Sequence, residues 1–363
     1  RKRLSAIERD IANGPLHHLR GRLFIVYRQT ITALILGGEL AEAEGYYRRM
    51  QALMAQARDW QTYVYFGEAW QAQIEHAKAE IAGARGQFQI AEIAHGRTAT
   101  LLKTAIGKMP TWPSGTVVAT KERLEYQIDF EMGQRGRAKA KQGRLAEAEV
   151  DARAALLSRL KAQGKYTVST ANLIEELAFV LLLQGRYAEA ERLLRTTLEI
   201  RRTVGVAANS EASVGNLRRL SSLATLQQRH QDAAKLDAEI DQIIKSWEPQ
   251  RRQLYEFDSN RVYSLLATGQ ISDAVAAAQK LMAREISRLG KAHPDVALSR
   301  GLLAIGYAKA GRYSEALAEF RKSVPQLLAT TRTTDIDESA VVALRSARIR
   351  DVIEGYVGVL LSE

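Results

Sequence analysis

Cysteine is absent from this chain of 363 residues, which excludes disulfide bonds, thiolate metal sites and a cysteine nucleophile within it. Proline is scarce, with six residues, and aromatic side chains make up 7% of the sequence. No run of about 18 apolar residues occurs, so we expect no membrane insertion. The abundant residues, such as Ala, Leu, Arg, Glu and Gln, are strong helix formers, and no strand-like alternation is visible. The composition therefore predicts an all-α protein.

The formal net charge is +11, carried mainly by arginine. Such a charge favours anionic partners and raises nonspecific binding to nucleic acid. The basic doublets are spread along the chain rather than gathered in one block: Arg48-Arg49, Arg201-Arg202, Arg218-Arg219 and Arg251-Arg252. Scattered charge of this kind is typical of solvated helix faces. We interpret most of it in that way, with weak nonspecific nucleic-acid binding as a secondary expectation.

One short phrase recurs along the chain and sets its organisation. Its clearest copies are Gly185-Arg186-Tyr187-Ala188-Glu189-Ala190 and Gly311-Arg312-Tyr313-Ser314-Glu315-Ala316. The seven copies begin at Gly38, Gly86, Gly143, Gly185, Gln228, Gly269 and Gly311. From Gly143 onward the spacings are 42, 43, 41 and 42 residues. A fixed period in this range indicates a solenoid whose unit is one helical hairpin.

Each position of the phrase fits the turn between two helices. The glycine ends the first helix, because a left-handed backbone after a helix costs glycine least. The residue two positions later is large and is expected to pack across the hairpin: Leu40, Phe88, Leu145, Tyr187, His230, Ile271 and Tyr313. The alanine three positions further on marks a close approach of two helices, where a larger side chain would overpack the contact. These alanines are Ala43, Ala91, Ala148, Ala190, Ala233, Ala274 and Ala316.

The sequence predicts seven helix pairs and a terminal helix. The pairs span about 20–37/40–57, 60–83/87–107, 120–142/145–164, 169–184/187–204, 210–227/230–247, 250–268/271–289 and 295–310/313–331. Ser210, Pro249 and Pro294 support three of the helix starts, and His293 is expected to help cap the last of them. A last helix at about 338–361 is expected to cap the array, and residues 1–12 are expected to be helical.

The segment 108–118 breaks the rhythm of the repeats. It contains Pro110 and Pro113, and the phrase spacings around it are 48 and 57 residues. We interpret it as a long connector with Trp112 packed on a neighbouring helix, and a hinge between two groups of repeats is the alternative. The predicted organisation is an N-terminal extension with two divergent hairpins at 1–107, this connector at 108–118, five hairpins at 119–331, and a capping or linker helix at 332–363.

This pattern resembles the tetratricopeptide repeat (TPR). In the best copy Leu177, Ala178 and Leu181 precede the turn glycine, and Tyr187, Ala190, Leu194 and Leu198 follow it. The period of about 42 residues exceeds the usual TPR period of about 34 residues. HEAT and armadillo units are about as long as the units of this chain, but the Gly-x-aromatic-x-x-Ala core argues against them. The stretch from Gly290 to Ala297 is similar to the 42-residue repeats of kinesin light chains. The resemblance implies a right-handed superhelical solenoid of about seven TPR-like hairpins plus the C-terminal capping helix.

Bacterial proteins use the same long repeat, where it often precedes a caspase-like CHAT peptidase. The ending from Ala347 to Tyr356 is similar to the helix that leads into that peptidase. This resemblance implies that any catalytic His and Cys lie beyond Glu363. The chain begins at Arg1 without methionine or a signal-peptide pattern, so we expect a piece of a longer protein. The compartment stays open: the cytoplasm is favoured, and the periplasm is the alternative if an upstream signal was removed.

We expect a non-catalytic scaffold or sensor that binds a protein or peptide segment, acidic segments included, and regulates an attached or partner effector domain. Two alternatives stay open, namely a basic solenoid that binds nucleic acid and a ligand-sensing array of a transcription regulator. No cofactor is expected, because no glycine-rich phosphate loop occurs and neighbouring carboxylates such as Glu175-Glu176 do not converge on a helix. No metal is expected, because His17-His18 lacks further convergent ligands.

The useful surface of such an array is its concave groove, lined mainly by the first helix of each pair. Counting from the turn glycines places seven candidate partner-binding residues there: Arg28, His76, Arg137, Asn172, Arg218, Asn260 and Tyr263. Arginine and asparagine could hold a peptide backbone or its carboxylates through directed hydrogen bonds. Ordinary solvated polar residues are the alternative interpretation at each position.

Overall fold

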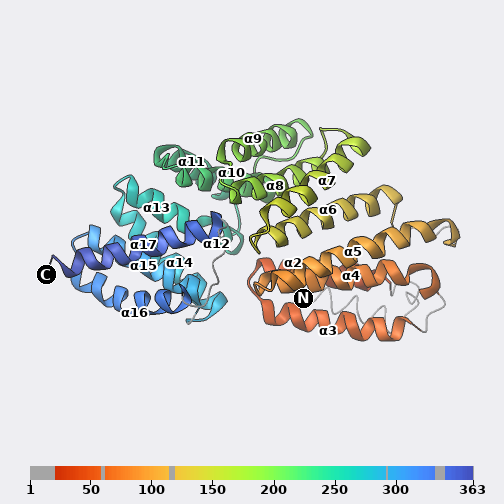
Figure 1. Cartoon of the computed structure of the whole chain (residues 1–363), viewed down its shortest axis with the longest axis horizontal. Coiled ribbons are helices and arrows are strands. Elements are labelled where there is room, and N and C mark those ends of the chain that lie inside the picture. Colours follow the sequence, from red (N-terminus) through yellow and green to blue (C-terminus); the bar gives the residue numbers. More distant parts are fainter. Residues whose placement is uncertain (1–20, 59–61, 114–118, 292, 332–339, 363) are drawn as a thin grey trace. The chain divides into compact units, whose positions relative to one another are not determined.

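The computed structural model describes residues 21–58, 62–113, 119–291, 293–331 and 340–362. All regular structure in these ranges is helical, which confirms the predicted all-α class (Figure 1). The chain forms two compact units, unit 1 at Arg1–Gly164 and unit 2 at Lys165–Glu363. The four-segment organisation stays a prediction, and the helix expected at 1–12 lies outside the described residues. Within the described ranges, no helix combines the length and the apolar character that crossing a membrane requires.

Helical hairpins follow one another in each unit, as the repeat predicts. Unit 1 contains α2 (Arg22–Leu36), α3 (Leu40–Ala57), α4 (Tyr63–Ala84), α5 (Phe88–Lys108), the short 3₁₀ helix η2 (Met109–Thr111), α6 (Lys121–Ala140) and α7 (Leu145–Gln163). Unit 2 contains α8 (Val168–Leu183), α9 (Tyr187–Thr203), α10 (Glu211–Leu226), α11 (His230–Ile244), α12 (Pro249–Glu256), α13 (Ser259–Ala267), α14 (Ile271–Leu289), α15 (Pro294–Lys309), α16 (Tyr313–Thr331) and α17 (Ala340–Leu360). Within a unit each hairpin packs on the next, as α4 packs on α2 and α3, and α15 packs on α13 and α14.

The predicted helix at 250–268 is wrong as a single element, because the chain breaks it into α12 and α13. Phe257 and Asp258 have extended backbones at the break. The Asp258 side chain accepts a hydrogen bond from the Arg261 backbone N–H at 2.8 Å and so caps a new helix. Caps at Ser210 and His293 confirm two other predicted helix starts.

In the turns between paired helices, the predicted glycines adopt the left-handed backbone conformation. Gly185 has a φ of 75°, and the other five glycines of the phrase have φ values between 74° and 81°. After α8, Arg186 N–H donates to the Leu181 carbonyl and Gly185 N–H donates to the Leu182 carbonyl. This pair of bonds is the Schellman motif, which satisfies carbonyls at the end of a helix.

The degenerate copy at Gln228 keeps the same turn without glycine. Gln228 has a φ of 58°, and among the described residues it alone combines a side chain with a positive φ. A side chain in this region costs about 1–2 kcal/mol, whereas glycine adopts it freely. We therefore expect Gln228→Gly to raise the free energy of unfolding by about 0.5–1 kcal/mol, measured by urea denaturation. A decrease would show that the Gln228 side chain contributes more than its backbone strain costs.

The seven phrase alanines lie where the helices of a pair meet. Each is buried, with at most 2% of its surface exposed. The large residue of the phrase is less enclosed: Leu40, Phe88, Leu145, Tyr187, His230 and Ile271 are half-buried, and Tyr313 is 46% exposed. Tyr313 is the most exposed of the seven, and its packing across the hairpin stays a prediction. The alanine, not the large residue, marks the tightest contact of each hairpin.

Ala190 offers a direct test of this contact. It is fully buried where α9 packs on α8. We expect Ala190→Trp to lower the free energy of unfolding by about 1–3 kcal/mol or more, because the indole has no space between the helices. Thermal melting followed by circular dichroism measures the loss, and an unchanged melting curve would contradict the alignment of this repeat. Ala188→Trp, at an exposed position of the same turn, serves as the control.

The C-terminal core of unit 2 joins α13 to α17. Phe320 and Leu302 are fully buried, and Ile349, Val352 and Val359 of α17 belong to the same cluster. The predicted last helix is therefore found as α17, which packs on α15 and α16. In unit 1, Trp112 packs on α4 as predicted, with its ring centroid 5.0 Å from that of Phe66.

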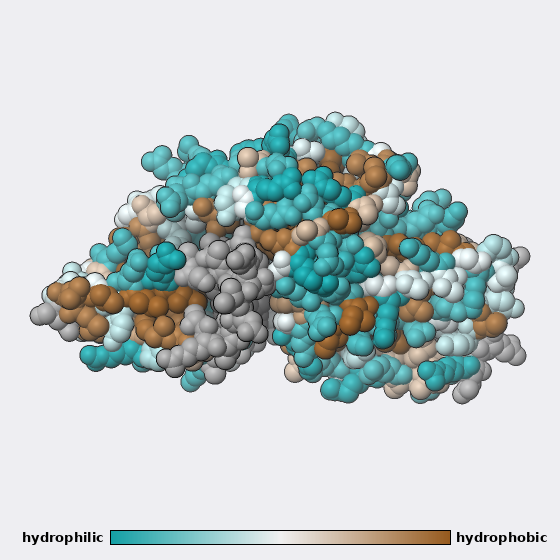
Figure 2. All heavy atoms as spheres, in the orientation of Figure 1, coloured by the Kyte–Doolittle hydropathy of each residue, from teal (hydrophilic) through white to brown (hydrophobic). Residues whose placement is uncertain are grey.

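The face drawn in Figure 2 carries both polar and apolar side chains. Figure 2 shows a mainly hydrophilic face on which apolar residues gather toward the end where α16 and α17 lie. Leu328, Val357 and Leu360 are among the exposed large apolar side chains of these helices. Arg201, from one of the basic doublets, is buried at 2% exposure, so the interpretation as solvated surface is wrong for this residue.

Candidate functional site

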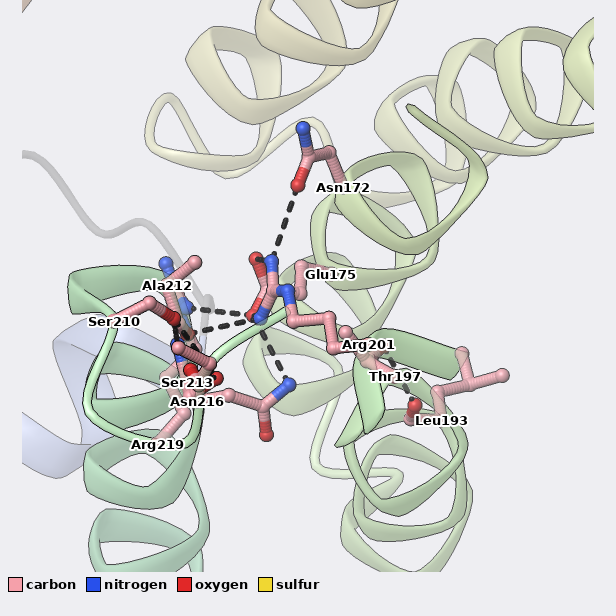
Figure 3. Close-up of polar contacts among 11 residues, drawn as sticks. Asn172, Glu175, Leu193, Thr197, Arg201, Ser210, Ala212, Ser213, Asn216 and Arg219 are labelled. Atoms are coloured by element: carbon pink, nitrogen blue, oxygen red, sulfur yellow. Dashed lines mark hydrogen bonds and ion pairs between the residues drawn. The ribbon is translucent and has the colours of Figure 1, made fainter. Parts of the chain in front are cut away.

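A buried carboxylate joins three helices of unit 2 (Figure 3). Glu175 of α8 accepts two hydrogen bonds from Arg201 of α9, from NH1 to Oε1 at 2.7 Å and from NH2 to Oε2 at 2.8 Å. The Arg201 side chain is only 2% exposed and that of Glu175 10% exposed. Such a two-pronged contact matches the planar guanidinium to the carboxylate and fixes both side chains. The pair thereby locks the α8–α9 hairpin.

Residues of α10 complete the surroundings of this ion pair. Asn216 Nδ2 and Arg219 NH1 donate to Glu175 Oε1 at 3.0 Å and 3.1 Å. Arg201 also donates to the Ala212 carbonyl at 2.9 Å and to Asn172 Oδ1 at 3.1 Å. A buried charge is tolerated only when its partners satisfy it, and this carboxylate receives four donors. Figure 3 shows these side chains converging from neighbouring helices.

Polar contacts continue from α10 to α13 and α17. Arg218 NH1 donates to Asp258 Oδ2 at 2.9 Å, and Asn260 Nδ2 donates to Ser222 Oγ at 2.8 Å. Arg348 of α17 donates to Ser259 Oγ at 2.9 Å and to Asn260 Oδ1. We call the set of side chains on α8, α10 and α13, with Arg201 of α9, the α8–α13 network. It comprises Asn172, Glu175, Arg201, Asn216, Arg218, Arg219, Ser222, Asp258 and Asn260.

Tyr263 lies beside this network, next to α17. The Arg348 guanidinium lies 5.4 Å from the centroid of the Tyr263 ring, which favours a cation–π contact. Burial raises the pKa of the Tyr263 phenol, and the nearby Asp351 carboxylate raises it further. Burial also lowers the pKa of Arg348. A binding partner that reached Tyr263 would therefore meet a side chain of α17 as well.

A second polar cluster lies in the interior of unit 1. His76 of α4 and His95 of α5 both face Glu131 of α6, with Nδ1–Oε1 and Nδ1–Oε2 distances of 2.5 Å and 2.7 Å. The three residues are 4%, 6% and 0% exposed. Burial alone would lower the pKa of His76 and raise that of Glu131. Their mutual attraction, and the contacts with Glu80 and His95, reverse both effects, so that His76 has a pKa of about 9 and Glu131 of about 2. We call these three residues the His–Glu–His cluster.

The outer nitrogen of His76 has its own neighbours. Glu80 Oε2 lies 3.5 Å from His76 Nε2, and Arg28 NH1 lies 3.4 Å from the same atom. Thr32 donates to both carboxylate oxygens of Glu80, at 3.0 Å and 2.7 Å. Glu80, Arg28 and Thr32 thus form a second set of contacts around the cluster, on the Nε2 side of His76.

The predicted groove residues fall into two groups, one in each unit. In unit 1 the structure brings Arg28 and His76 together, although His76 is buried, and Arg137 lies half-buried on α6. In unit 2, Asn172, Arg218 and Asn260 all belong to the α8–α13 network, and Tyr263 lies beside it. The role of these residues in partner binding stays a prediction.

Sequence reasoning missed Glu131, His95 and Glu175. A signal existed, because each lies on the buried stripe of its helix: Glu131 is seven residues from the buried Leu124 and Ala138. His95 likewise lies four residues from two buried alanines of α5. A charged or ionisable residue at helical spacing among buried positions indicates a buried partner. The partners themselves are 36 and 55 residues apart for the two histidines, which no helical period connects.

Comparison with known proteins agrees with this architecture. Residues 132–203 match the tetratricopeptide repeat family. No curated protein matches the sequence. The predicted resemblance to TPR proteins with kinesin-light-chain-like repeats is confirmed, whereas no comparison shows a link to CHAT peptidases.

Solved structures show similar folds at low sequence identity. RapI without ligand is 13% identical, with 85% of this chain and 99% of that chain covered and a TM-score of 0.52. A Rap protein complexed with competence and sporulation factor is 13% identical, with 84% and 76% covered and a TM-score of 0.51. TPR-like repeats of a putative kinesin light chain from Podosopora anserina are 19% identical, with 58% and 99% covered and a TM-score of 0.43. The two Rap structures support an all-α helical repeat solenoid.

Proposed function

We propose that this chain is a non-catalytic repeat module that binds a protein or peptide segment on the α8–α13 network. The observation that carries this proposal is that polar contacts join the first helices of three successive hairpins. Contacts between side chains join α8 to α10 through Glu175 and Arg219, and join α10 to α13 through Arg218–Asp258 and Ser222–Asn260. Three of the seven predicted residues take part in the network. Extended segments are recognised by such directed hydrogen bonds from fixed side chains. The likeness to a Rap protein solved with a bound factor supports the same use of the fold.

Arg219 is the most useful residue for a test. Its side chain is 36% exposed, and NH1 is bonded to the buried Glu175 carboxylate. The guanidinium is therefore held in place while part of it faces outward, and a guanidinium has five N–H donors. A peptide carboxylate or backbone carbonyl would accept from this group. This arrangement favours an acidic segment over a neutral one.

The experiment selects peptides from a displayed random library on the full chain and measures their affinity by fluorescence anisotropy. We expect Arg219→Ala to weaken the selected peptides by about tenfold or more, while Arg195→Ala leaves them unchanged. Arg195 lies on α9, where its side chain is 63% exposed and paired with Glu191. Equal binding to the two variants, or failure to select any peptide, would contradict the proposed site.

Salt separates this function from simple polyanion binding. The affinity of binding that depends mainly on contacts with phosphates falls by orders of magnitude between about 50 and 200 mM salt. We expect a selected peptide to keep most of its affinity over that range and a DNA duplex to lose its affinity. A duplex that binds tightly at about 0.5 M salt, with peptides that do not bind, would favour a specific nucleic-acid function instead.

We extend the proposal to regulation of an attached or partner effector domain. The long-repeat resemblance implies this role, and the contact of Arg348 with Asn260 supplies a physical connection from the network to α17. Binding that leaves α17 as protected from hydrogen exchange as before would argue against such a connection.

A further inference from the structure

We propose that the His–Glu–His cluster of unit 1 is a binding site for one divalent transition-metal ion of the zinc type. The candidate ligand atoms are His76 Nδ1, His95 Nδ1 and a carboxylate oxygen of Glu131, and all lie within 4.8 Å of one another. They come from α4, α5 and α6, so three packed helices fix their positions. Two imidazoles and one carboxylate form a donor set suited to zinc, cobalt and related ions.

The three side chains already face one another without metal. Hydrogen bonds between the same three groups hold them at 2.5 Å and 2.7 Å, with both imidazoles directed at one carboxylate. Two ligand atoms on one zinc ion are about 3.3 Å apart, given Zn–N and Zn–O bonds of about 2.0–2.2 Å. Zinc binding therefore requires both His–Glu distances to lengthen by less than about 1 Å, and the most separated ligand atoms, up to 4.8 Å apart, to move closer together. The metal replaces the Nδ1 hydrogens, which leave as protons, and the Glu131 carboxylate changes from hydrogen-bond acceptor to ligand.

The contacts of His76 Nε2 fit a metal-binding role for this histidine. Histidines that bind a metal through one nitrogen usually donate the hydrogen on the other nitrogen to a carboxylate. His76 Nε2 lies 3.5 Å from Glu80 Oε2, and Thr32 orients that carboxylate. Two carboxylates, those of Glu80 and Glu131, lie beside the candidate ligand atoms and would favour an incoming cation. A water molecule or another small ligand would complete the coordination beyond the three protein ligands.

The test uses the full chain, stripped with a chelator and titrated with ZnCl₂ by calorimetry. We expect one zinc ion per chain and a melting temperature several degrees higher in excess zinc, because the metal binds the folded state. CoCl₂ should produce visible absorption bands of nitrogen and oxygen coordination. Binding of less than about one tenth of an equivalent of zinc, or cobalt without such bands, would overturn the proposal.

Matched variants locate the ion. Glu131→Gln keeps the size of the side chain but removes the anionic ligand and replaces one acceptor oxygen with an amide donor, and His95→Gln removes one imidazole. We expect at least about 100-fold weaker zinc binding in both, with helical content unchanged by circular dichroism. A His17→Gln/His18→Gln double variant and His293→Gln should bind zinc as the parent does. Retained affinity in the two cluster variants, or its loss in the controls, would place the metal elsewhere.

Discussion

Replacing Glu175 by alanine is expected to lower the free energy of unfolding by about 3–5 kcal/mol. The change removes the carboxylate but leaves the Arg201 guanidinium buried, with its side chain 2% exposed. A guanidinium cannot lose its proton at accessible pH, so the charge has to be tolerated or brought to solvent. Asn216 and Arg219 lose an acceptor at the same time. Urea denaturation followed by circular dichroism measures the change.

Two further variants distinguish the cost of leaving the Arg201 charge buried without a partner from the cost of losing the ion pair itself. Changing Glu175→Leu together with Arg201→Met removes both charges, and we expect a much smaller loss than for Glu175→Ala, because well-packed apolar groups often replace a buried ion pair at little cost. Arg195→Ala breaks the exposed pair with Glu191 and should change stability by no more than about 1 kcal/mol. A loss below about 1 kcal/mol for Glu175→Ala would mean that water or a local rearrangement satisfies Arg201.

Phe320→Ala is expected to cost about 3–5 kcal/mol, because it removes a fully buried ring from the C-terminal core of unit 2. The ring lies on α16, and its centroid is 5.5 Å from that of Tyr356 on α17. A Cβ atom in place of a hydrogen at Gly355 would lie 3.2 Å from the same ring, which indicates close packing. The truncation therefore loosens α17 as well as the core. Hydrogen exchange of α17 should accelerate together with the loss of global stability.

Tyr313 on the same helix provides the control for this prediction. It is 46% exposed, so Tyr313→Ala should change stability by about 0.5 kcal/mol or less. Equal losses for the two variants would contradict the assignment of Phe320 to the core. A large loss for Phe320→Ala without faster exchange in α17 would show that this helix is held mainly by Ile349, Val352 and Val359.

Much of the fold could be predicted because the repeat depends on interactions between residues that are close in the sequence. A left-handed turn, a cap and a small contact residue each depend on residues a few positions apart, as the bonds around Gly185 illustrate. The break between α12 and α13 was missed because the pattern of 250–268 fits one helix, while the cap at Asp258 favours two. Propensity alone did not decide between these outcomes.

The candidate sites were only partly predictable. Counting along first helices identified Asn172, Arg218 and Asn260, each of which belongs to the α8–α13 network. The same counting placed His76 at a groove position, where the structure buries it against Glu131. The rotation of each helix about its own axis decides between these outcomes, and that rotation follows from the packing of neighbouring hairpins.

The amino-acid order alone determined the helical class, the hairpin repeat, the turn glycines and the buried alanines, because these follow from interactions within one turn or one hairpin. Only the tertiary structure decided which charged side chains meet. The groups that converge on Glu131 lie 36 and 55 residues away, and Asn216 reaches Glu175 across 41 residues. Such contacts depend on how successive hairpins stack, and burial then makes their hydrogen bonds strong and their loss costly.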